Sequence, residues 1–145
     1  MSDELAASAS EPVAFRVVHV EDVLYDFALG SARVVLREAE GAQRVLTLPI
    51  ALADATALHQ AWRHLAGRRP STAELLTVIM QELHADVIAT RIVRQESGVF
   101  YAELDLMTTK GRRVFDARPS DAMVIALRQS YPAPILVAAD LLTTP

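Results

Sequence analysis

The chain has 145 residues, a length typical of one compact domain that buries roughly two thirds of its unfolded-state surface without a metal or disulfide staple. It contains no cysteine, which excludes a disulfide framework, Cys-ligated zinc, iron–sulfur clusters and thiol catalysis. The formal net charge of −4 lacks the strong positive balance that proteins bound to the phosphate backbone usually carry.

The apolar content is high for a small soluble monomer. Hydrophobic residues make up 52% of the chain and the mean hydropathy is +0.23. Because a subunit interface buries such an excess, we expect a homodimer or a higher homo-oligomer. Residues 1–12 are small and polar and predict a disordered tail before a single domain over 13–145. Without a basic leader or a long apolar run, we expect a cytoplasmic bacterial protein that does not contact the membrane.

The first half of the chain predicts a strand meander followed by two helices. β-Branched segments over 15–20, 32–37 and 44–50 indicate three antiparallel strands. Helical spacing then runs to Leu65, and Gly67 is the expected stop. Ser71 and Glu74 have the spacing of a capping box that begins the second helix. The stripe expected to be buried in that helix is Leu75, Leu76, Ile79, Met80 and Leu83.

The second half predicts another meander, a helix and a short last strand. The expected strands are 86–94, 99–107 and 112–117, with turns at 96–98 and 109–111. Arg118 and Pro119 mark the start of the third helix, and 134–137 is the final strand before a turn at 140–142. Meanders interrupted by helices at irregular intervals indicate an α+β fold. We therefore expect a single compact domain with a mostly antiparallel or mixed sheet and three main helices.

Several segments occur in the order and spacing of one protein family. The longest runs from Phe115 to Arg128 and contains Arg118-Pro119-Ser120-Asp121-Ala122. The shorter ones are Leu48-Pro49-Ile50, Arg69-Pro70-Ser71-Thr72, the hairpin segment Gly98 to Leu104, and Pro134-Ile135 with Leu141-Leu142. Together they resemble the bifunctional nuclease (BFN) domain family over roughly residues 15–142. The resemblance implies a compact, usually oligomeric α+β domain, with members that cleave DNA and RNA.

The sequence departs from that family in two segments, and the first also has Ala53 where the family has a glycine. The family's glutamate after Leu-Pro-Ile is Thr56 here, and its Thr-His-Asp is Thr72-Ala73-Glu74. Asp54 is near the first position, but two residues along a helix is a rotation of about 200°, so we expect Asp54 to point the other way. If the glutamate and histidine serve chemistry in the family, this chain lacks both; if they serve packing, little is lost.

Phosphodiester hydrolysis needs an activated water and positive charge at the phosphorus, usually from Mg²⁺ or another divalent cation held by carboxylates. The best local cluster is Asp116, Arg118, Ser120 and Asp121, beside the start of a helix. In the functional interpretation Asp121 and Asp116 bind the metal, Arg118 grips phosphate and Ser120 hydrogen-bonds it. In the structural interpretation Ser120 or Asp121 caps the helix and Arg118 pairs with a carboxylate.

Three other acidic residues are candidates with simpler explanations. Glu103 and Asp105 share a strand face and are spaced to bind one metal, with Glu103 the preferred ligand, but a solvated hairpin face is the alternative. Glu74 is a catalytic candidate that the capping box already explains.

Basic residues at two turns are candidates for nucleic-acid contact. They are Arg63, Arg68 and Arg69 after the first helix, and Lys110, Arg112 and Arg113 at the hairpin turn. Of these we take Arg69, Arg112 and Arg113 as the nucleic-acid-binding set, with Trp62 and Tyr101 available for base stacking. Ordinary solubilising charge with aromatic residues in the core is the alternative. Accordingly, the two functional hypotheses are a metal-dependent nuclease for DNA and RNA, and a non-catalytic oligomeric module that has lost the family's Glu and His.

Overall fold

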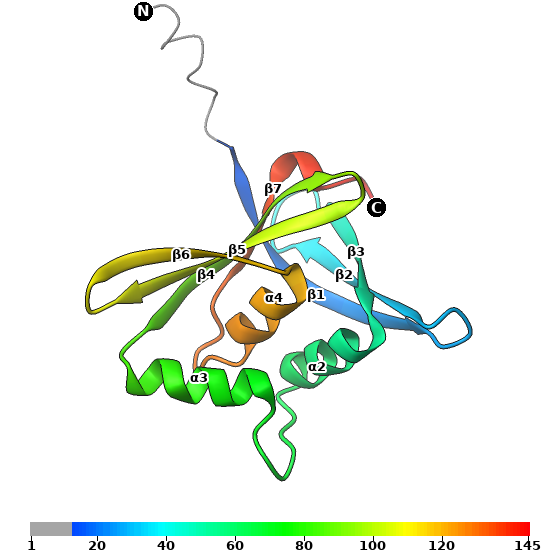
Figure 1. The fold of residues 1–145 in the computed structure, drawn as a ribbon. Coiled ribbons are helices and arrows are strands. Elements are labelled where there is room, and N and C mark those ends of the chain that lie inside the picture. The colour runs from blue at the N-terminus through cyan, green and yellow to red at the C-terminus, as the bar shows by residue number, and fades with distance from the viewer. Residues whose placement is uncertain (1–12) are drawn as a thin grey trace, which may run out of the picture.

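A seven-stranded sheet organises residues 13–145, the part of the chain that the computed structural model describes (Figure 1). The strands are β1 (Phe15–Asp26), β2 (Ser31–Glu38), β3 (Val45–Ala51), β4 (Asp86–Glu96), β5 (Val99–Thr108), β6 (Gly111–Ala117) and β7 (Ile135–Ala138). The helices are α2 (Leu52–Trp62), α3 (Thr72–Glu82) and α4 (Pro119–Leu127), with a 3₁₀ turn, η1, over Ala139–Leu141. These elements confirm the predicted α+β fold. The tail expected over 1–12 lies outside the described residues.

The sheet consists of two antiparallel meanders joined by one short strand. Its strand order is β3-β2-β1-β7-β4-β5-β6. β7 pairs antiparallel with β1 and parallel with β4, which makes the sheet mixed. The helices gather on one side of the sheet, as Figure 1 shows. Within the described residues no helix has the length and apolarity needed to span a membrane.

β1 is twice as long as the sequence indicates because a bulge changes the phase of its side chains. Val18 and Val20 are buried, and the next buried residue is Val23 instead of position 22. The register with β2 shifts between Val20 and Asp22. An extra residue at a bulge reverses the alternation beyond it, so the period-two pattern breaks at Val20 although the strand continues.

Helix α2 ends in a backbone motif that the sequence pattern does not predict. α2 stops at Trp62, earlier than the predicted end at Leu65. His64 has a positive φ of 56°, and the Leu65 amide donates to the Gln60 carbonyl at 2.8 Å. The positive φ of His64 and this hydrogen bond together form a Schellman motif, which usually has glycine at the position of His64. Gly67 is therefore not the stop signal.

The main core lies between the sheet and helices α2 and α4. It contains Leu36 and Leu48 from the N-terminal meander, Leu58 from α2 and Met123 from α4, all fully buried. α4 is fixed to the sheet by a buried hydrogen bond in which the Thr90 hydroxyl donates to the Ala122 carbonyl at 2.9 Å. The start of α4 is thus held against β4 of the sheet.

The predicted buried stripe of α3 is wrong. Of its apolar residues only Met80 is buried, together with Thr77. The exposed members of the stripe are Leu75 (51%), Leu76 (40%), Ile79 (45%) and Leu83 (68%). The helix start is as predicted, because Ser71 and Glu74 form both bonds of the capping box. α3 therefore presents an apolar side to the exterior of the monomer.

Candidate active site

A cavity of about 840 Å³ opens where α2, α3 and α4 meet the end of β6. Its polar lining consists of Asp54 from α2, Ser71 and Thr72 at the start of α3, Asp116 from β6, and Arg118, Ser120 and Asp121 at the start of α4. Four of these seven residues are the predicted cluster of the Arg-Pro-Ser-Asp segment. The fold thus places that segment against two other elements around one solvent-accessible cavity.

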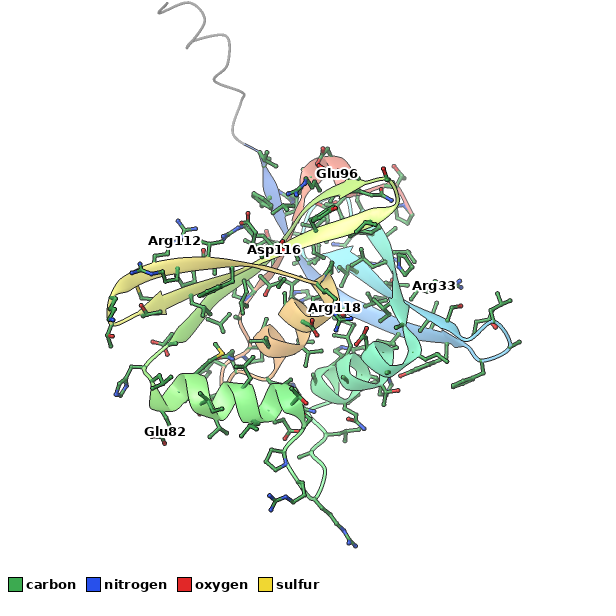
Figure 2. The ribbon with its side chains drawn as sticks, in the orientation of Figure 1. Arg33, Glu82, Glu96, Arg112, Asp116 and Arg118 are labelled. Atoms are coloured by element: carbon green, nitrogen blue, oxygen red, sulfur yellow. The ribbon has the colours of Figure 1, made fainter. Side chains whose placement is uncertain are left out.

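Arg118, labelled in Figure 2, bridges two carboxylates at this cavity. Its Nε and Nη2 atoms donate to Asp121 at 2.8 and 3.0 Å. Its Nη1 and Nη2 atoms donate to Asp54 at 3.1 and 3.4 Å. The hydrogen bond to Asp121, then the charges of Asp121 and Asp54, raise the pKa of Arg118. The guanidinium therefore stays charged, and 64% of the side chain is exposed to solvent.

The predicted side-chain cap of α4 is absent. Arg118 itself is the N-cap, with extended backbone angles and no side-chain cap hydrogen bond, and Pro119 follows as the first helical residue. The Asp121 carboxylate instead accepts a hydrogen bond from Arg118. Ser120 is buried, with 6% of its surface exposed. The structural interpretation is thus wrong about the cap and right about the Arg118–carboxylate pair.

Asp54 is the site residue that sequence reasoning sets aside. The Thr56 hydroxyl donates to the carbonyl of Leu52 in its own helix, and the residue is exposed. Asp54 instead lines the cavity and contacts Arg118. The two side chains do point in different directions, as expected, but it is Asp54 that faces the motif. The first turn of a helix immediately after Leu-Pro-Ile is the sequence signal that places an acid there.

Glu74 lies outside the cavity lining. Its carboxylate closes the capping box with Ser71 and lies 3.8 Å from Arg128. Glu74 thus has the structural role that the capping-box spacing offers.

Glu103 and Asp105 belong to a separate ion cluster on the β4–β5–β6 face. Asp105 is buried, with 2% of its surface exposed, so the solvated-face interpretation is wrong for this residue. Arg112 donates to both of its oxygens at 2.9 and 2.8 Å, and Arg91 at 2.9 Å. The hydrogen bond from Arg112, followed by that from Arg91, lowers the pKa of Asp105 against the effect of burial. Glu103 is 3.5 Å from Arg91.

Over residues 13–145, no three His, Asp or Glu side chains converge closely enough to form a metal centre alone. Glu103 and Asp116 are register partners on β5 and β6, so both side chains lie on the sheet face of Asp105. Asp116 borders the cavity through its place at the end of β6, but its carboxylate points to the other side of the sheet, and the prediction of Asp116 and Glu103 as metal ligands with Asp121 is wrong. The pair that fits a cation best is Asp54 with Asp121, whose carboxylates meet the same guanidinium. Mg²⁺ commonly uses one or two carboxylates and takes its remaining ligands from water and substrate phosphate.

The predicted basic set is divided by the fold. Arg69 is exposed in the loop before Ser71 and is not among the residues that line the cavity. Arg112 is held by Asp105 on the other side of β6, and Arg113 donates to the Arg112 carbonyl. Both candidate stacking rings already contact arginines, with Arg63 4.3 Å from the Trp62 centroid and Arg94 4.2 Å from that of Tyr101. None of the predicted three thus lines the cavity.

Comparison with known proteins identifies relatives of this chain. A family model described as the bifunctional nuclease domain matches residues 34–144. Two Mycobacterium tuberculosis proteins, the uncharacterized proteins MT1877 (strain CDC 1551 / Oshkosh) and Rv1829 (strain ATCC 25618 / H37Rv), are each 35% identical to it over 99 residues. The aligned region covers 68% of this chain and 58% of each relative. The chain thus spans little more than half the length of these relatives.

Proposed function

Because the chain belongs to the bifunctional nuclease domain family, we propose that it hydrolyses phosphodiester bonds of DNA and RNA at the Arg118 cavity. The observation that carries this proposal is the bridge from Arg118 to Asp54 and Asp121, which brings a cationic donor and two potential metal ligands together in one accessible cavity. A phosphodiester needs both kinds of group, because negative charge develops on the phosphoryl oxygens during attack.

Arg118 is the phosphate-binding residue in this proposal. Its planar guanidinium carries several N–H donors in a fork that matches two phosphate oxygens. Its high solvent exposure leaves room for a substrate anion to compete with the two carboxylates. The buried Ser120, which also lines the cavity, provides a further contact.

Asp54 and Asp121 are the residues that would hold a divalent cation. The cavity offers the carboxylates of Asp54 and Asp121 against the one guanidinium of Arg118, so its acidic lining disfavours phosphate unless a cation is also present. When bound, Mg²⁺ or a similar ion supplies Lewis acidity and a more acidic water. Release of Arg118 from the carboxylates would then couple cation binding to phosphate binding.

The test is cleavage of labelled single- and double-stranded DNA and RNA by purified protein, with magnesium, manganese, calcium or EDTA. Arg118→Ala is compared with Arg33→Ala, which removes an exposed arginine outside this cavity. We expect metal-dependent cleavage that falls by about 100- to 1000-fold in Arg118→Ala, the loss typical of removing one electrostatic donor from a transition state. Arg33→Ala should cleave as the unmodified protein does, and a loss confined to Arg118→Ala excludes a contaminating nuclease.

The alternative function is a non-catalytic oligomeric binding module. It is favoured by Thr56 and Ala73, which stand where the family has its glutamate and histidine. No cleavage with any substrate or ion, or equal cleavage by Arg118→Ala and the unmodified protein, would contradict the nuclease proposal. A salt-sensitive gel shift without cleavage would then support the binding module.

A further inference from the structure

The two edges of the sheet are protected to very different degrees. At the β3 edge, Pro49 removes one donor, and an isolated bridge from Val45 to Thr143 covers the start of the strand. At the other edge, β6 pairs only with β5, in unbroken register from Gly111 to Ala117, and it contains no proline. An edge strand without such protection is a template for pairing with another chain.

The exposed side chains of β6 include large apolar groups. Val114 is 45% exposed and Phe115 is 51% exposed. The Arg112 side chain is 57% exposed even though it is bound to Asp105. The central residues of β6 thus combine an unpaired strand edge with exposed apolar side chains and a charged one.

We propose that a second copy of this chain pairs with β6 in antiparallel register about a two-fold axis at Val114. In that register Arg112 lies opposite Asp116 of the second copy, and Arg113 lies opposite its Phe115. Opposite charges and an arginine facing an aromatic ring both stabilise cross-strand neighbours. The segment Arg112-Arg113-Val114-Phe115-Asp116 is therefore complementary to its own reverse, as a two-fold interface requires.

The apolar side of α3 supports the same partner. Leu76 lines the cavity together with Asp116 and Ala117 of β6, so this side of the helix is turned toward the β6 edge. Leu83 follows Leu76 at a spacing of seven residues and lies on the same helix side. The opposite flank is occupied, since Glu74 and Gln81 contact Arg128 and Ser130 near the end of α4. Pairing of two β6 strands extends the sheet across the axis and lets the two α3 helices pack on each other.

The pairing also places an opposite charge beside Asp116. Arg112 of the second copy would lie directly opposite it, on the sheet face that carries Asp105. The interface is formed by the edge strand and α3, and it does not depend on whether the cavity cleaves phosphodiesters.

A cysteine at the axis tests this register directly, because the natural chain has none. Directly opposed residues of antiparallel strands have Cα atoms about 4.5–5.5 Å apart, within the range of about 4.4–6.8 Å that a disulfide spans. We expect Val114→Cys to form a covalent dimer under mild oxidation. Val99→Cys is the matched control, since Val99 is similarly exposed, at 54%, on β5 instead of the edge strand. Equal cross-linking of both variants, or none at position 114, would overturn the register.

A second variant separates loss of pairing from loss of the fold. Val114→Lys places two like charges at the axis while leaving the β5 side next to the carboxylate of Asp105. By sedimentation, we expect a dimer for the unmodified chain and for Val99→Lys, and a monomer with an unchanged circular dichroism spectrum for Val114→Lys. A monomeric unmodified chain, or a dimer that survives Val114→Lys, would contradict the proposal.

Discussion

Glu38 is a buried carboxylate held by two arginines, and it dominates the polar contacts of the N-terminal meander. It accepts hydrogen bonds from Arg44 Nε at 2.7 Å, from the Arg44 amide at 2.9 Å and from Arg16 Nε at 2.9 Å. Chiefly through the side-chain bond from Arg44, these contacts lower the pKa of Glu38 from 4.5 to about 2, against the opposing effect of burial. The residue thus stays ionised in the folded protein at pH values where the unfolded chain is protonated.

The lowered pKa of Glu38 makes a prediction about acid stability. A carboxylate with a depressed folded-state pKa stabilises the fold above its unfolded pKa, and that contribution disappears as the pH falls through the folded value. We expect the free energy of unfolding to fall between pH 4.5 and about pH 2, with Glu38→Gln losing less over this interval than the unmodified chain. Urea unfolding at several pH values measures both. Parallel pH profiles for the two proteins would show that Glu38 does not contribute.

Within single elements, sequence patterns identified each strand and helix better than its limits or its buried side. The break in alternation at Val20 is a bulge, and helix α2 ends at a positive-φ histidine instead of at Gly67. The apolar stripe of α3 has the periodicity of a buried helix, yet only Met80 reaches the core. Periodicity reports that a surface is apolar; it does not distinguish burial within one chain from burial between two chains.

The exposed stripe of α3 predicts a difference between neighbouring substitutions. Met80→Ala should lower the free energy of unfolding by about 2–5 kcal/mol at every protein concentration, as for other buried large-to-small changes. Ile79→Ala should destabilise only when the protein is concentrated enough to dimerise, because association stabilises by mass action. Urea unfolding at widely separated protein concentrations measures this. Equal losses for Ile79→Ala at all concentrations would place Ile79 within the monomer's own core.

At the scale of the whole molecule, the two meanders were predictable because each is built from neighbours in sequence. Their union was not, because β7 is four residues long and its partners, β1 and β4, are distant in the chain. The Arg-Pro-Ser-Asp half of the site was likewise visible as a local motif. Asp54 was not, since its contact with Arg118 spans 64 positions and exists only after α2 and α4 pack.

Asp54 therefore offers the most direct test of the catalytic proposal. The measurement is the rate of metal-dependent cleavage by Asp54→Asn, compared with Asp86→Asn, an exposed aspartate at the start of β4. The substitution keeps the size of the side chain but removes the charge that would hold a cation. We predict that Asp54→Asn cleaves far more slowly than the unmodified chain and recovers partly at high metal concentration, while Asp86→Asn is unaffected. Full activity of folded Asp54→Asn would contradict the assignment of this cavity as the active site.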